Sequence, residues 1–144
     1  MYQDTITVFN YHKESGLWYP SVIEGANLLA NKASSLTGTG ITNADAVDVI
    51  IHCTADKMIS TRSGDKKYIG PKEYARCADP SGFITFQPEG DFLYDGVWDD
   101  LTPVDDNGYD SGLYHVMNEE HDGVYLISSA AFYSLLPHFE IGGK

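Results

Sequence analysis

The chain has 144 residues, the size of a single domain, and it shows no fixed repeat and no Pro/Ser/Gly linker. Its formal net charge of −12 lies in residues 78–144, which hold thirteen acids and one Lys, whereas residues 1–77 balance eight acids with eight Lys or Arg. DNA-binding domains hold phosphates with clustered basic residues, so this charge pattern argues against that class of function.

The first half of the chain predicts three strands. Thr5–Tyr11 is rich in β-branched and aromatic residues, and Leu17–Ile23 returns after a polar turn of hairpin length. Pro20 has no N–H for a strand ladder, which places the second strand at an edge or at a bulge. Ala46–Cys53 predicts a central strand. Three of its apolar residues share one face: Val47, Val49 and Ile51.

The polar segment Thr54–Lys67 predicts a long surface loop. It carries nearly half of the basic residues of the chain, namely Lys57, Arg62, Lys66 and Lys67. Long loops in small domains frequently carry function. These four side chains are therefore candidate contacts with a partner.

Two helices and two short strands are predicted next. Pro71–Cys77 begins with proline at the first helical position and predicts two helical turns. Ile84–Phe86 and Phe92–Tyr94 predict short strands around a Pro/Gly turn. Asp110 is placed to cap a helix that runs to about Glu120. Its apolar residues recur at helical spacing: Tyr109, Leu113, Val116 and Met117.

An acidic loop precedes this second helix, over residues 99–108. Its candidate surface residues are Asp99, Asp100, Asp105 and Asp106. An EF-hand calcium loop requires a glycine at the sixth position and a glutamate at the twelfth, and no acid in this stretch starts such a frame. We interpret the segment as an acidic turn held by Asx hydrogen bonds.

The longest nearly uncharged run is Val124–Ile141, which is rich in β-branched and aromatic residues. Small residues at Ser128–Ala131 predict one strand that bends there or two strands that share a tight corner. Its serines, a histidine and Pro137 argue against a membrane span. We expect the run to be buried on both faces at the centre of the core. The predicted fold class is mainly β: a small β-barrel or sandwich, with one long loop, one short helix and one medium helix.

Catalytic and metal-binding patterns are weak. His115 and Glu119 are four residues apart on the predicted helix, with Asp122 close by, but no third ligand occurs at a motif spacing. Cys53 and Cys77 are too few for a disulfide framework, and we expect reduced thiols. Adjacent strand residues point to opposite faces, so His52 does not activate Cys53. We therefore expect no enzyme activity and no cofactor. Met1–Asp4 shows no signal-peptide pattern.

Several segments resemble a family of small proteins encoded by tailed phages and prophages of Gram-positive bacteria. The similar segments lie at both ends and in the middle of the chain: Asp4–Asn10, Trp18–Val22, Tyr68–Tyr74, Ile84–Phe86 and Pro137–Lys144. Genes of this family lie in the head–tail morphogenesis cluster, between capsid and tail genes, and the family has no assigned catalytic residues. The resemblance implies a structural virion protein of the head–tail connector, or neck, made in the host cytoplasm.

Within the neck, the β-rich prediction and the basic loop Thr54–Lys67 favour the head-closure ring, or stopper. Stoppers are small β-barrels with a long loop that reaches the DNA channel, whereas adaptors are mostly helical bundles. The implied assembly is a homo-oligomeric ring of about twelve copies. Its implied partners are the portal and adaptor proteins above, the tail terminator and tail tube proteins below, and genomic double-stranded DNA passing through the lumen. No membrane is implied. This step is an analogy at the level of the fold.

The charge pattern has two interpretations that fit this setting. It forms a solvated acidic surface that keeps the protein soluble, or a surface that faces a polyanion without binding it. The neutral half and the acidic half are also suited to a head-to-tail contact between ring subunits. Alternatives remain open: a tail terminator or tail-completion protein, a minor capsid protein, or a small metal-binding enzyme.

Overall fold

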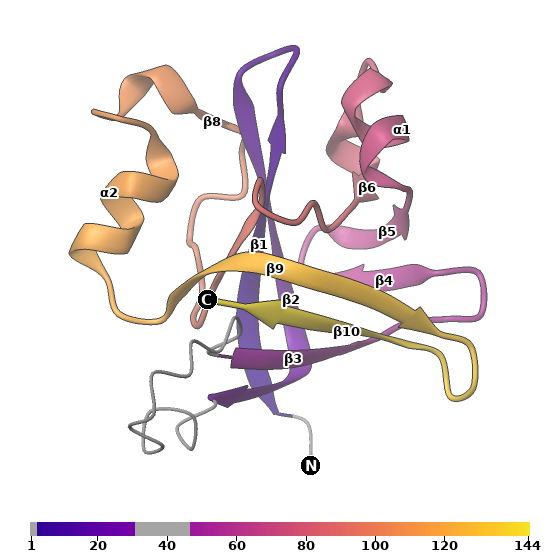
Figure 1. Ribbon diagram of the computed structural model, residues 1–144. Helices are drawn as coiled ribbons and strands as arrows, with labels where there is room; N and C mark the ends of the chain where they lie inside the picture. Colours follow the sequence, from indigo (N-terminus) through magenta and orange to yellow (C-terminus); the bar gives the residue numbers. More distant parts are fainter. Residues whose placement is uncertain (1–2, 31–46) are drawn as a thin grey trace.

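The computed structural model describes residues 3–30 and 47–144, and the fold is mainly β (Figure 1). Six antiparallel strands close into a barrel, beside a small three-stranded sheet and two short helices. The barrel strands are β1 (Asp4–His12), β2 (Leu17–Ala30), β3 (Val47–His52), β7 (Phe92–Tyr94), β9 (Val124–Tyr133) and β10 (His138–Gly143). The small sheet contains β4 (Met58–Thr61), β5 (Gly64–Tyr68) and β6 (Phe83–Ile84). The helices are α1 (Pro71–Arg76) and α2 (Leu113–Glu120), and β8 (Val104–Asp105) extends the barrel sheet. The predicted fold class is confirmed.

The barrel closes through β2, which has fourteen residues and pairs with two different strands. Its first part pairs with β1 as a hairpin, and its last four residues pair with β3. The β1–β2 register shifts between Asp4 and Ile6, where Gly25 has a φ of 77°. A bulge of this kind bends a strand, so that one end of β2 can pair with β1 and the other end with β3, which closes the barrel. The backbone N–H of Leu28 donates to the Asp4 carboxylate at 2.8 Å and fixes the strand beyond the bend.

The prediction of β3 is confirmed from Val47 onward. Val47, Val49 and Ile51 are fully buried, whereas Asp48 faces solvent. Ala46 lies outside the described residues. Pro20 lies opposite Phe9, between the stretches of β2 that pair with β8 and with β3. The described residues place no strand on its other side, in agreement with its missing N–H.

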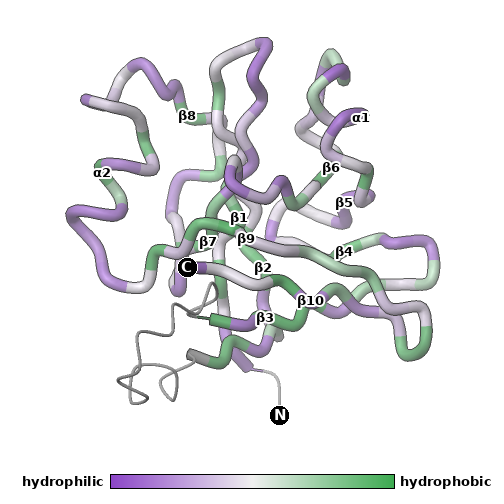
Figure 2. Tube along the Cα trace, in the orientation of Figure 1, coloured by the Kyte–Doolittle hydropathy of each residue, from purple (hydrophilic) through white to green (hydrophobic). Residues whose placement is uncertain are grey.

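Two hydrophobic clusters lie on either side of the barrel wall. The first fills the interior and includes the inward residues of β1, β3, β9 and β10. Figure 2 shows the hydrophobic residues along β9 and β10. The second lies between the wall and α2, where Phe9 stacks on Phe92 with ring centroids 4.5 Å apart. Leu113 and Met117 are the buried residues of α2. β1 is therefore buried on both faces, and each fully buried large side chain contributes about 2 kcal/mol.

The expectation for Val124–Ile141 was partly wrong. The run does form two strands, but they turn at residues 134–137 and not at Ser128–Ala131. It is not buried on both faces either: from Ser128 onward the residues of β9 alternate between half-buried and exposed, and Tyr133 is 46% exposed. Helix α2 packs only against the first residues of β9, at Val124 and Leu126, and no helix of the described chain lies over the rest of β9 and β10 in Figure 1. Small outward residues such as Ser129 and Ala131 suit an uncovered face.

The predicted long loop at residues 54–67 was also wrong, because most of it is the β4–β5 hairpin. Arg62 and Ser63 form a two-residue turn, and Gly64 follows with a φ of 107°. The Thr61 hydroxyl accepts a hydrogen bond from the Ser63 N–H at 3.1 Å within this turn. Ile59 is fully buried and anchors the hairpin on the core. The second predicted helix begins at Leu113, and Gly112 precedes it with a φ of 95°.

Candidate interaction surfaces

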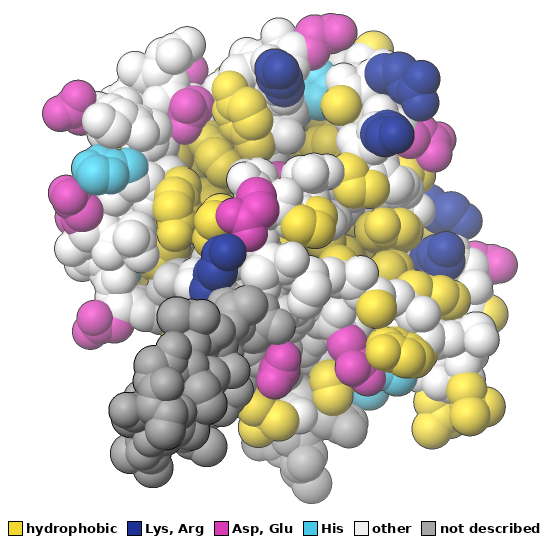
Figure 3. All heavy atoms as spheres, in the orientation of Figure 1, with side chains coloured by type: hydrophobic (Ala, Val, Ile, Leu, Met, Phe, Trp, Pro, Cys, Tyr) yellow, Lys and Arg dark blue, Asp and Glu magenta, His cyan; other side chains and the backbone are white. Residues whose placement is uncertain are grey.

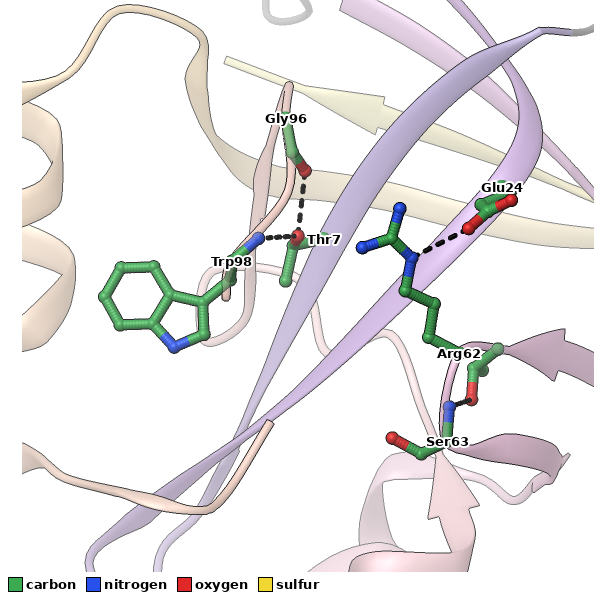
Figure 4. Close-up of polar contacts among 7 residues, drawn as sticks. Thr7, Glu24, Arg62, Ser63, Gly96 and Trp98 are labelled. Atoms are coloured by element: carbon green, nitrogen blue, oxygen red, sulfur yellow. Dashed lines mark hydrogen bonds and ion pairs between the residues drawn. The ribbon is translucent and has the colours of Figure 1, made fainter. Parts of the chain in front are cut away.

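The basic candidates lie on the β4–β5 hairpin, and two of them are paired within the chain. The Arg62 Nε lies 2.7 Å from a carboxylate oxygen of Glu24 on β2, and both side chains are exposed (Figure 4). The backbone N–H of Arg62 also donates to the Val22 carbonyl at 3.0 Å. The Lys67 Nζ donates to the Asp56 carbonyl at 2.8 Å. The two contacts of Arg62 hold the hairpin against β2, while the charges of Arg62 and Lys67 remain at the surface.

The other two basic candidates differ sharply from each other. Lys66 is buried, with 6% of its surface exposed, and its Nζ donates to the Ser21 hydroxyl at 2.7 Å. Burial lowers the pKa of Lys66, because the charged amine loses water. Lys66 is therefore a core residue and not a surface contact. Lys57 lies over the ring of Phe132 at 4.7 Å and over that of Tyr68 at 5.7 Å, which positions its charge beside the end of β9.

The acidic candidates divide into structural and exposed residues. One Asp106 carboxylate oxygen accepts from the Trp18 indole N–H at 2.7 Å and from the Leu113 N–H at 2.8 Å, so Asp106 caps α2 in place of the expected Asp110. Asp105 accepts from the Asn107 N–H at 3.0 Å. Asp100 accepts from the backbone and hydroxyl of Thr102, and these bonds lower its pKa. These are the Asx turns that the sequence predicts, and Asp99 is exposed beside them.

Charge is separated between two ends of the barrel. Figure 3 shows Lys and Arg side chains gathered over α1 and the β4–β5 hairpin, and Asp and Glu side chains along the α2 edge. The separation is incomplete, because Figure 3 also shows Asp and Glu side chains beside the basic ones, and Lys144 pairs with Glu89 at 3.0 Å. The acids of residues 78–144 thus give the α2 edge an excess of negative charge. Such an arrangement orients a charged partner along one axis of the molecule.

A hollow of about 360 Å³ opens on the acidic side, at the end of β7. It is lined by Tyr94, Val97, Trp98, Asp99, Asp100 and His121. The Thr7 hydroxyl donates to the Gly96 carbonyl at 2.9 Å and accepts from the Trp98 N–H at 3.1 Å (Figure 4). The Trp98 ring also packs edge-on against Phe9, with centroids 5.3 Å apart. The wall of this hollow is therefore fixed to β1.

The β9–β10 turn is the most exposed apolar feature of the described residues. Leu135 is 85% exposed and Leu136 is 81% exposed. Leu136 adopts a φ of 50°, a conformation that a leucine rarely takes. The turn projects beyond the barrel at the far end of β9 in Figure 1. Adjacent exposed leucines on a projecting turn are typical of a contact site.

One buried carboxylate lies inside the barrel end, at Asp91. It accepts hydrogen bonds from the backbone N–H of Tyr11 at 2.9 Å and of Gln87 at 3.0 Å, and from the Asn10 amide at 2.9 Å. Burial outweighs these three donors and raises the pKa of Asp91 to about 6. Burial, with the Asp91 charge next in effect, also raises the pKa of Tyr74, whose buried hydroxyl has no hydrogen-bond partner in the described structure. We assign this cluster a structural role, because it has no opening to solvent at Asp91, which is 1% exposed.

The positions of the His, Cys and acidic side chains give little support to a metal site or a reactive thiol. His115 Nε2 lies 3.3 Å from the Glu119 carboxylate, and both side chains are exposed. Within residues 3–30 and 47–144, no group of three His, Cys, Asp or Glu side chains is placed to hold a metal ion. Cys53 and Cys77 are free thiols. Burial raises the pKa of the Cys53 thiol, which lowers its thiolate fraction at neutral pH.

Sequence reasoning missed the exposed leucines and the aromatic hollow. The signal for the leucines was present: Ser134–Pro137 separates two β-rich stretches by four residues, a usual hairpin-turn length. The hollow had no local signal, because its residues come from β7, the segment after it and the residue that follows α2. In the described part of the chain, no helix is both long and apolar enough to cross a membrane.

A family model described as a family of unknown function, DUF6751, matches residues 1–144. The chain belongs to this family. No curated protein and no solved structure matches it. The family assignment covers the whole chain and names no activity, so the function has to be argued from the surfaces described above.

Proposed function

We propose that this protein is a structural component of the head–tail connector of a tailed phage, forming a ring that joins the portal and adaptor to the tail. In this proposal the ring is stopper-like, closes or lines the DNA channel, and catalyses no reaction. The proposal begins from the sequence resemblance at both ends and in the middle of the chain. The structural observation that supports it best is the separation of charge between two ends of one barrel (Figure 3).

Charge separation suits a ring because ring interfaces are heterologous. Each subunit presents one patch to the neighbour on one side and a different patch to the neighbour on the other. The basic β4–β5 hairpin and the acidic α2 edge are two such patches. Attraction between them orients subunits head to tail, whereas like patches repel each other.

The net charge also suits a channel for DNA. Thirteen acids in residues 78–144 give the protein a negative field overall. Duplex DNA moving through a ring is not retained by a surface of like charge. In this proposal the acidic surface left outside the contacts faces the lumen, and DNA passes without sequence-specific binding.

Mass measurement of the purified assembly tests the ring directly. Twelve copies of a 15.9 kDa chain give about 190 kDa, and six copies give about 95 kDa, the value expected of a tail-terminator hexamer. Averaged images of the same sample give the rotational symmetry. We expect closed rings at low salt, and fewer of them as the salt concentration rises, because screening weakens charged interfaces.

Purified phage particles provide the second test. The polypeptide should be detected by mass spectrometry in a fixed ratio to the portal protein, and labelling should place it at the neck. Absence from particles would reject the proposal. Rings that are indifferent to salt would reject the charge-based interface, and location within the capsid shell would favour the minor capsid alternative.

A further inference from the structure

We propose that the β9–β10 turn of one copy of this protein docks into the aromatic hollow of the next copy. The inference rests on the proposed function, because it specifies how ring subunits would join. The occupant of the hollow is thus a second copy of this chain, and the contact is made by Leu135 and Leu136.

The turn has the features of a docking element. Leu135 and Leu136 project from the end of a hairpin and contact water over more than four fifths of their surface. Leu136 also holds a left-handed backbone conformation, φ 50°, which glycine or asparagine would adopt with less strain. A leucine in this conformation lowers the folding stability of the isolated subunit. A contact with another copy would compensate for that loss.

The hollow has the features of a receptor for apolar side chains. Tyr94, Val97 and Trp98 supply apolar walls, and Val97 is itself 36% exposed. The two hydrogen bonds of Thr7 hold the backbone behind Trp98 in place (Figure 4). A preformed hollow requires little ordering when a partner binds.

The turn and the hollow lie at opposite ends of the same strand. Tyr94 pairs with Val124, the first residue of β9, and the turn begins after Tyr133, the last residue of β9. Ten residues of strand span about 30 Å. A subunit therefore cannot fill its own hollow, and two unlike patches at opposite ends define a head-to-tail contact that repeats around a ring.

Charge complements the apolar contact. Lys57 lies beside the end of β9, over the Phe132 ring at 4.7 Å, and so accompanies the turn. Asp99 and Asp100 line the hollow beside its apolar walls. Docking the turn of one copy brings a cation toward two carboxylates of the next. The exposed Glu140 near the turn is paired with His138 at 3.0 Å, so it opposes this attraction less than a free carboxylate would.

Site-directed disulfide cross-linking between two variants tests the contact. One preparation carries Leu136→Cys and the other carries Val97→Cys, and they are mixed at about 1 mM under a mild thiol oxidant. We expect a covalent dimer in the mixture, and peptide mass spectrometry should place the bond between the two introduced cysteines. Neither variant alone should form it. The wild-type chain, with Cys53 and Cys77, gives the background.

Three outcomes would overturn the inference. A bond that forms in Leu136→Cys alone would indicate a two-fold contact between turns. A mixture that cross-links no more than wild type would show that the turn does not reach the hollow. A bond from Leu136→Cys to any other surface of the chain would place the contact elsewhere.

A second measurement does not depend on oxidation. The double variant Leu135→Ser, Leu136→Ser should self-associate at least about tenfold more weakly than wild type in sedimentation experiments. Leu29→Ser is the matched control, because Leu29 is 57% exposed and pairs with Asp48, which pairs with Gly142 at the end of β10 opposite the turn. Equal association by the double variant and the control would overturn the inference. Circular dichroism confirms that both variants remain folded.

Failure of this inference and failure of the proposed function are distinguishable. Rings that form normally without the turn-to-hollow bond would reject only the docking contact. A bond that forms in a protein absent from phage particles would reject only the connector function.

Discussion

Asp106 joins three parts of the structure through one carboxylate oxygen, and its removal should be more damaging than its partly exposed position suggests. Replacing it with alanine deletes the acceptor for the Trp18 indole N–H and for the Leu113 N–H. Trp18 is 5% exposed, so its N–H would lose its acceptor in a buried place. Hydrogen bonds to a charged group contribute about 1.5 kcal/mol each at the lower end of their range. We therefore expect Asp106→Ala to lower the free energy of unfolding by about 3 kcal/mol.

Urea denaturation followed by far-ultraviolet circular dichroism measures this loss. A protein of this size has an m-value of about 1.5 kcal/mol/M, so the midpoint should fall by about 2 M. Asp106→Asn keeps an oxygen at the same place and should lose about 1 kcal/mol. Asp105→Ala is the control, because Asp105 accepts one exposed hydrogen bond from Asn107 and should lose less than about 1 kcal/mol. Equal losses for Asp106→Ala and Asp105→Ala would refute the assignment of Asp106 as the cap of α2.

Two buried charges give predictions of opposite sign with pH. Burial raises the pKa of Asp91 from 3.8 to about 6, so the folded state retains a proton that the unfolded state loses. The free energy of unfolding should therefore fall by about 3 kcal/mol as the pH rises from about 4 to 6. Subtracting the pH profile of the Asp91→Asn variant isolates this contribution. A difference profile that is flat between pH 4 and 6 would contradict the burial argument. The pKa of Lys66 is lowered by burial, so the folded state releases its proton first and stability should rise as pH increases toward 10.5, relative to Lys66→Met. Lys67→Met, which removes a surface amine, should leave this rise unchanged.

The sequence predicted those elements whose burial follows a simple local period. Alternation at Val47, Val49 and Ile51 located β3, and Pro71 located the start of α1. The β4–β5 hairpin was missed because one of its inward positions is Lys66. The amine of this buried lysine is satisfied by a hydrogen bond to the Ser21 hydroxyl, which is distant in the sequence. A pattern based on polarity assigns such a strand to a loop. Contacts across the fold decide the outcome, and they have no local signal.

The surfaces were predictable to a smaller extent. The division of charge along the chain predicts an acidic region, but it did not separate Asp106, which caps a helix, from exposed Asp99. Hydrophobicity also failed to separate the buried Ile141 from the exposed Leu135 and Leu136, because it measures composition and not position in a turn. Where a surface residue is held by a hydrogen bond from another element, only the folded structure can show it.

The position of β10 in the barrel determines when the sheet can close during translation. β10 lies between β3 and β9, so both of those strands keep an unpaired edge until residues 138–143 have left the ribosome. A nascent chain that already contains the β1–β2 hairpin must therefore wait for residues 138–143 before the wall is complete. During that interval its open edges are able to pair with those of neighbouring chains. Expression at low temperature, or with chaperones in excess, should raise the yield of soluble protein for this reason.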